Sequence, residues 1–260
     1  SAKIKMSIIT LTSDFGELDY YVPLFKGSIL RSCPSVKLID ISHKIQPFDI
    51  NTAAYIVKNC FESFPPKSLH IIRVGENSSD NQRIMAVNYR GHYFIGPDNG
   101  VLSMIFEELP TLVIAVDKNM ISLPNMDEYY CRAIKNFVFK GNISEIGYSV
   151  VDFERKILLK SVIYPNYLVG NIMHIDNYGN LISNISKEDF EKAVDGRKFA
   201  IHYRRMETIE EIVNDYSDVE GGDKLAMFNS LGNLEIAING GKANELFGIN
   251  IGDAIKIEYR

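Results

Sequence analysis

The feature of this sequence that most limits its possible folds is a change of pattern after about residue 160. Before that point, short β-branched apolar runs alternate with amphipathic stretches, and this alternation predicts a doubly wound α/β domain. After it, short β-type runs follow one another with Gly, Asn and Asp between them, which is typical of a small antiparallel sheet or barrel. We therefore expect an N-terminal α/β domain over residues 1–165 and a C-terminal antiparallel β-barrel domain over residues 166–260.

The expected elements follow from these patterns. Strands of the first domain are expected at residues 8–11, 36–42, 68–74, 84–89, 92–95 and 112–116. Amphipathic stretches at residues 20–30, 49–61 and 127–139 are expected to form helices. The later β-type runs cover residues 156–164, 168–175, 181–185, 198–202, 225–228, 234–238 and 254–259. The segment Tyr164-Pro165-Asn166 interrupts the pattern and sets the expected boundary.

Composition excludes several classes of partner. The net charge of −5 and the lack of a Lys/Arg-rich run predict no nucleic-acid or anionic-membrane partner. The N-terminal apolar run is short and is followed at once by Thr, Ser and Asp, so it predicts neither a signal sequence nor a membrane span. Cys33, Cys60 and Cys131 are odd in number and widely spaced, so we expect reduced cysteines in a cytoplasmic protein, with no disulfide framework and no zinc site.

Asp14 is the first candidate functional residue. It follows the apolar run that ends at Leu11, in a turn with Ser13 and Gly16, and a helical stretch comes next. Ligands of open α/β sheets lie at the carboxyl ends of strands, which is where Asp14 is expected. Asp is also common as the cap of a following helix. Taken alone, the position favours the cap.

The second candidate is the turn from Asp176 to Asn180. Asp176 offers a carboxylate for a cation, Tyr178 a ring for stacking, and Asn180 an amide that both donates and accepts. These three side chains suit a ligand with an amine and an aromatic base. An ordinary Asn/Gly-rich hairpin turn is the alternative, and it is the better interpretation of this segment in isolation.

The commoner catalytic signatures are absent from the sequence. It contains no GxSxG, HExxH, P-loop or GxGxxG pattern. The histidines are scattered, mostly on or beside expected strands, where a hydrogen-bonded structural role is the usual one. They are His43, His70, His92, His174 and His202. We expect no metal site and no cofactor.

Five segments, taken together and in order, resemble the S-adenosylmethionine hydroxide adenosyltransferase family, which also includes the S-adenosylmethionine-dependent chlorinase and fluorinase. The segments cover nearly the whole chain and are residues 12–22, residues 39–47, Gly96-Pro-Asp-Asn-Gly100, residues 176–184 and residues 229–237. Each motif alone is weak, but five in the same order identify the chain as a member of that family. The resemblance implies the two-domain fold expected above and a homotrimer, with the ligand between the first domain of one subunit and the second domain of its neighbour.

The resemblance also implies roles for single residues. Asp14 binds the ribose hydroxyls in this assignment, and Asp176 binds the methionine amino group. Tyr178 stacks on one face of adenine and Asn180 meets its edge. Ser230 is expected at the methionine carboxylate, and Tyr216 on the other adenine face. These roles match the side-chain chemistry, and they outweigh the cap and turn interpretations.

The sequence departs from the family at the catalytic positions. In hydroxide-transferring members, an Asp, an Arg seven positions later and a distant His surround the attacking water. Ungapped alignment from His70 places Gly75 and Gln82 at the Asp and Arg positions, and residues 125–128 replace the segment with the His. A shift of one residue places Glu76 and Arg83 at the same spacing, and these two are the candidate catalytic residues.

The expected function is binding of S-adenosylmethionine and its hydrolysis to adenosine and methionine by attack of water or hydroxide on the ribose C5′. The sequence leaves two alternatives open. One is a catalytically degenerate protein that binds S-adenosylmethionine or adenosine, and the other is an S-adenosylmethionine-dependent halogenase.

Overall fold

The computed structural model describes residues 8–76, 82–117, 125–204 and 207–260. The chain divides into two compact units, residues 1–157 and 158–260. This division falls before Pro165 because the short strand β8 (Val162–Ile163) pairs with β9 (Tyr167–Ile175) of the second unit. Each unit is described by itself. No helix among the described residues has both the length and the apolar character needed to span a bilayer.

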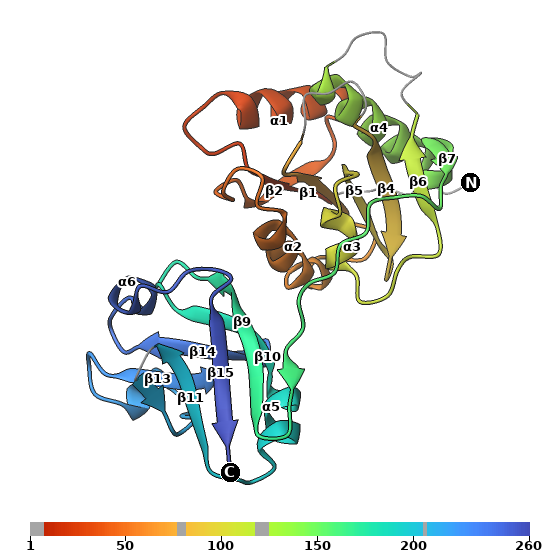
Figure 1. Cartoon of the computed structure of the whole chain (residues 1–260). Helices are drawn as coiled ribbons and strands as arrows, with labels where there is room; N and C mark the ends of the chain where they lie inside the picture. The colour runs from red at the N-terminus through yellow and green to blue at the C-terminus, as the bar shows by residue number, and fades with distance from the viewer. Residues whose placement is uncertain (1–7, 77–81, 118–124, 205–206) are drawn as a thin grey trace. The chain divides into compact units, whose positions relative to one another are not determined.

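The first unit is built on a mixed sheet with the strand order β2-β1-β3-β5-β4-β6-β7 (Figure 1). The pairs β1–β2, β1–β3 and β3–β5 are parallel, and the remaining pairs are antiparallel. The strands are β1 (Ile8–Ser13), β2 (Lys37–Ser42), β3 (Leu69–Arg73), β4 (Ile84–Tyr89), β5 (His92–Pro97), β6 (Val113–Val116) and β7 (Gly147–Ser149). The parallel half places the carboxyl ends of β1, β3 and β5 at one edge, where a ligand site is expected.

Helices cover both faces of this sheet, which confirms the doubly wound α/β prediction (Figure 1). Helix α1 (Tyr21–Ser32) packs with α4 (Met126–Lys140), and α2 (Ile50–Lys58) packs with α3 (Val101–Ile105). The 3₁₀ turns are η1 (Phe61–Ser63) and η3 (Ile143–Glu145). Fully buried side chains such as Ile9, Leu69 and Phe137 form the core against α1 and α4. Their burial follows from the apolar runs of the sequence.

His70 shows why a buried histidine need not be catalytic. Its Nδ1 lies 2.8 Å from Thr10 Oγ1, its Nε2 lies 3.2 Å from His92 Nδ1, and its ring stacks on Phe94. Burial, with a smaller contribution from His92, lowers the pKa of His70 to about 3, so the ring is neutral. His70 is therefore a hydrogen-bonded structural histidine, as the sequence predicted.

The second unit is an antiparallel sheet with the strand order β12-β11-β15-β9-β10-β14-β13, with β8 beside β9. It curves into a nearly closed barrel, since β12 and β13 at its two ends are in contact, and this confirms the predicted β-barrel class (Figure 1). The further strands are β10 (Leu181–Ser186), β11 (Phe199–Arg204), β12 (Glu207–Ile209), β13 (Lys224–Phe228), β14 (Asn233–Ile238) and β15 (Ala254–Tyr259). The short helices are α5 (Lys187–Val194), α6 (Ala243–Phe247) and the 3₁₀ turn η4 (Tyr216–Asp218).

Candidate functional site

Asp14 lies directly after β1 and binds loop amides rather than a helix. Its Oδ2 accepts hydrogen bonds from Phe48 N at 2.9 Å and from Gly75 N at 3.1 Å. The N-cap residue of α1 is Tyr20, and no side chain caps that helix. The cap interpretation of Asp14 is therefore wrong. In the described part of the chain, the other carboxylate oxygen, Oδ1, has no hydrogen-bond partner and is available to a ligand hydroxyl.

Gly75 follows β3 at the position where the family resemblance implies an Asp, and the structure explains why this chain has glycine there. Its φ is +67°, a conformation that favours glycine. A Cβ at this position would lie 3.0 Å from Asn99 Nδ2 and 3.1 Å from Ile50 Cγ2. An aspartate at position 75 would thus be both strained and crowded. This loop needs glycine there, and its amide serves Asp14 instead.

Arg73, the last residue of β3, is the centre of a buried ion-pair cluster. Its Nε and Nη2 donate to the two oxygens of Glu76 at 2.9 and 2.7 Å, and its Nη1 donates to Asp127 Oδ1. Its guanidinium also lies 4.5–4.8 Å from the ring centres of three aromatic residues, Phe15, Phe25 and Tyr130. Only 3% of Arg73 is exposed. We call Arg73, Glu76 and Asp127 the strand-end cluster.

The positive charge of Arg73 compensates part of the negative charge of the strand-end cluster. Burial lowers the pKa of Arg73, but its hydrogen bond to Glu76 and the charge of that carboxylate offset this, and the pKa is raised overall. The guanidinium is therefore a permanent cation between two carboxylates. A buried guanidinium that donates to two carboxylates fixes both Glu76 and Asp127 in position.

The two predicted catalytic residues lie in different ion-pair groups. Glu76 is bound by Arg73, whereas Arg83 donates from Nε to Asp98 Oδ2 at 2.9 Å and also pairs with Asp152. No hydrogen bond or ion pair joins Glu76 to Arg83 within the described ranges. Their spacing in sequence therefore does not translate into a direct pair, and their catalytic roles stay a prediction.

The turn between β9 and β10 forms a second half-site in the other unit. Asp176 Oδ1 accepts from the amides of Tyr178 and Asn180, both at 2.9 Å, and its Oδ2 accepts from Asn180 Nδ2 at 3.0 Å. Asn180 Nδ2 also donates to Tyr216 Oη at 3.2 Å. Tyr178 is 74% exposed, so one ring face is open for stacking. Four predicted ligand residues thus meet at one place, although Tyr216 is far from the other three in sequence.

These four residues line a cavity of about 630 Å³, together with residues 238–242. That volume is within the range of small-molecule sites. The four residues offer a carboxylate, an amide and two phenol rings, and the lining also includes Asn177, Asn239 and Lys242. Ser230 does not line it. It is exposed in the turn between β13 and β14, beside Asn229.

Glu235 is a site residue that the sequence reasoning missed. It lies on β14 with 4% of its surface exposed and accepts a hydrogen bond from the Tyr216 hydroxyl. Burial raises its pKa, and the nearby charge of Asp176 acts in the same direction. The signal was present, because Glu235 is the one acidic residue in the apolar run Leu234–Ile238. A buried acid needs hydrogen-bond partners, and Tyr216 is one of them.

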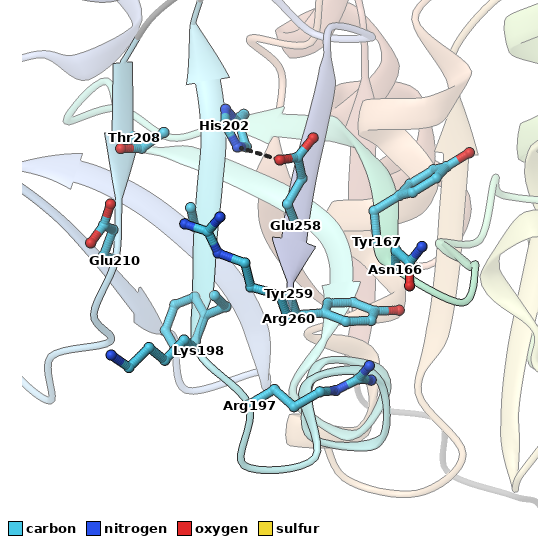
Figure 2. Close-up of a pocket in the computed structure, with 12 residues that line it drawn as sticks. Asn166, Tyr167, Arg197, Lys198, His202, Thr208, Glu210, Glu258, Tyr259 and Arg260 are labelled. Carbon is cyan, nitrogen blue, oxygen red and sulfur yellow. Dashed lines mark ion pairs between the residues drawn. The ribbon is translucent and has the colours of Figure 1, made fainter.

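A second hollow in the β-barrel unit has a different character. It measures about 800 Å³ and lies over β11, β15 and the start of β9 (Figure 2). Some of its charged groups already have partners: Glu258 pairs with His202 at 3.4 Å, and Arg197 donates to the carbonyls of Ala193 and Val194. None of the predicted site residues lines it. We therefore assign no ligand to it.

The side chains around both half-sites do not form a metal centre. Among the residues that the structure describes, no three His, Cys, Asp or Glu side chains are close enough together to hold a metal ion.

Comparison with known proteins identifies the family. Residues 9–137 match the profile of the SAM hydroxide adenosyltransferase N-terminal domain, and residues 170–256 match that of its C-terminal domain. The chain is 30% identical to the (R)-S-adenosyl-L-methionine hydrolase of Methanocaldococcus jannaschii over 98% of this chain and 97% of the relative. It is also 26% identical to the fluorinase of an Actinoplanes species, over 89% of this chain and 91% of the relative.

A solved structure has the same fold. An uncharacterized conserved protein from Thermotoga maritima superposes with a TM-score of 0.83 at 25% identity, covering 96% of this chain and 99% of that chain. The matched profiles span most of both structural units and include Asp14, Asp176 and Tyr216. The chain therefore belongs to the SAM hydroxide adenosyltransferase family.

Proposed function

We propose that this protein binds S-adenosylmethionine and hydrolyses it to adenosine and methionine. The observation that carries the proposal is the cavity where Asp176, Tyr178, Asn180 and Tyr216 meet, because it offers the groups that an ammonium and an aromatic base need. The free oxygen of Asp14 suits a ribose hydroxyl. Hydrolase relatives that match nearly the whole chain support the same reaction.

The chemistry asks little of the protein beyond positioning. The sulfonium sulfur is already a good leaving group, so the main task is to hold a water molecule in line with the C5′–S bond and to remove surrounding solvent. In the reaction the water oxygen bonds to C5′, the C5′–S electron pair passes to the sulfur of methionine, and one water proton goes to a base. General-base assistance of this kind is typically worth about 10²–10⁴-fold.

Binding and product analysis test the proposal. We expect calorimetric titration to show binding of S-adenosylmethionine, and chromatography after incubation to show adenosine and methionine. No binding at millimolar concentration, which corresponds to only about 4 kcal/mol, would refute the proposal. A 5′-halo nucleoside formed only with added halide would support a halogenase, and binding with unchanged substrate would support a degenerate binding protein.

We also propose that the protein forms a homotrimer. Exposed apolar side chains follow Asp14 in sequence at Leu18, Tyr20 and Leu24, and Phe48, which is also exposed, donates a backbone hydrogen bond to Asp14. Exposed apolar side chains gain stability when another surface covers them, and cyclic assemblies with heterologous contacts provide such a surface.

Light scattering tests the trimer. We expect a mass three times the 29.4 kDa of one chain, and Leu24→Glu should lower it. The matched control is Leu246→Glu, which changes a leucine of α6 that is exposed to a similar degree, and it should leave the mass unchanged. A wild-type monomer that still binds S-adenosylmethionine would contradict the trimer.

The remaining expectations are also proposals. We propose a cytoplasmic protein that uses no cofactor and no metal. The free cysteines Cys33, Cys60 and Cys131 support a reducing compartment. The net charge of −5 is consistent with a small-molecule ligand rather than a nucleic acid.

A further inference from the structure

We propose that Asp127 is the catalytic carboxylate that binds and deprotonates the attacking water, and that Arg73 is the positioning residue that holds it. This inference rests on the proposed hydrolysis and assigns its missing base. It replaces the pairing of Glu76 with Arg83, which the structure places in separate ion-pair groups.

Within the strand-end cluster, Asp127 is the carboxylate that retains a free oxygen. Arg73 occupies both oxygens of Glu76, and the side chain of Glu76 is only 13% exposed. In contrast, Arg73 contacts only Oδ1 of Asp127, and the side chain of Asp127 is 27% exposed. Among the described residues, Asp127 Oδ2 has no hydrogen-bond partner. A base needs such an open lone pair to accept a proton.

The strand-end cluster is linked to Asp14 on both sides. The Asp14 amide donates to the Arg73 carbonyl at 3.4 Å, and the ring of the next residue, Phe15, lies 4.8 Å from the Arg73 guanidinium. On the other side, the Gly75 amide that binds Asp14 directly precedes Glu76. A ribose bound by Asp14 would thus lie at the same strand ends as Asp127.

The charge of the strand-end cluster suits the reaction. Two carboxylates around one guanidinium leave a net charge of −1, which favours a sulfonium cation nearby. When the water oxygen bonds to C5′ and the C5′–S pair passes to sulfur, the water proton moves to Asp127 Oδ2 and then to solvent. Arg73, held by Glu76 and three rings, keeps Asp127 in place throughout.

In this proposal, the departure from the family at Gly75 is compensated in space rather than in sequence. Gly75 stands at the position where hydroxide-transferring members of the family carry the catalytic Asp. The backbone conformation and the crowding at this position require glycine in this chain. Asp127, 52 residues later in the first turn of α4, is held at the end of β3 by its hydrogen bond from Arg73. The acidic group is retained although its place in the sequence has changed.

The test compares Asp127→Asn with Glu128→Gln, its neighbour in the same helical turn, which pairs with Arg132 on the surface. We expect Asp127→Asn to bind S-adenosylmethionine with a Kd within about threefold of the wild type and to lose about 10²–10⁴-fold in kcat. The rise of kcat with pH in the wild type should be absent in this variant and restored in Asp127→Glu. Glu128→Gln should match the wild type in both constants.

Two further variants separate the roles. Arg73→Lys keeps the charge but not the fork, and we expect its kcat to fall with unchanged Kd. A wild-type kcat in Asp127→Asn, together with loss of the pH-dependent step in Glu76→Gln, would overturn the assignment in favour of Glu76. Binding without adenosine formation by the wild type would also overturn it and leave the binding function intact. Absence of binding would instead refute the proposed function itself.

Discussion

Replacement of Arg73 by methionine is expected to destabilise the N-terminal unit by about 3–5 kcal/mol, the cost of breaking a buried ion pair from one side. Methionine fills much of the same volume and packs well against the rings of Phe15, Phe25 and Tyr130, so little of this loss comes from packing. The loss comes from Glu76 and Asp127, which would keep their charges without a partner. Urea unfolding followed by tyrosine fluorescence and circular dichroism measures it.

Two comparisons make this result specific. Arg132→Met removes an exposed arginine whose partner, Glu128, is 40% exposed, so it should cost about 0–1 kcal/mol. The triple variant Arg73→Met, Glu76→Gln, Asp127→Asn leaves no buried charge, and it should recover much of the lost stability. A loss of less than about 1 kcal/mol for Arg73→Met would show that the strand-end cluster is not desolvated in solution.

Replacement of Asp176 by asparagine is expected to weaken binding of S-adenosylmethionine by about 10–150-fold, which corresponds to the 1.5–3 kcal/mol of a charged hydrogen bond. Asparagine keeps an oxygen that accepts from the amides of Tyr178 and Asn180, so the turn should remain folded. It loses the negative charge that would face the methionine ammonium, and it also loses the Oδ2 acceptor of the Asn180 side-chain amide. Isothermal titration gives the affinity directly.

The ligand itself provides a control for this variant. Adenosine has no ammonium, so its affinity should be nearly equal in the wild type and in Asp176→Asn. A second control is Asp195→Asn, at an exposed residue in the left-handed conformation at the end of α5. It changes the net charge by the same amount as Asp176→Asn, and the variant should bind S-adenosylmethionine as the wild type does. An equal loss for both ligands would show instead that the substitution disturbs the Asn180–Tyr216 contact.

Much of the fold was readable from the sequence because it depends on local periodicity. The alternation of apolar runs and amphipathic stretches predicted the α/β unit, and the short β-type runs after it predicted the β-barrel unit. Asp14 was placed correctly at a strand end because the polarity of the chain changes abruptly there. The turn of Asp176 and Asn180 was found because turn residues act over a few positions, and that range is visible in a linear sequence.

Tertiary structure alone decided the charged network of the site. Arg73 reads as one residue of an apolar strand run, yet it pairs with Glu76 nearby and with Asp127 on another helix. In the same way, Glu235 pairs with Tyr216, 19 residues away. A buried charge is stable only if a partner reaches it, and partners separated along the chain meet only after the sheet and helices have packed. Sequence spacing suggested Glu76 with Arg83, whereas packing gave each of them another partner.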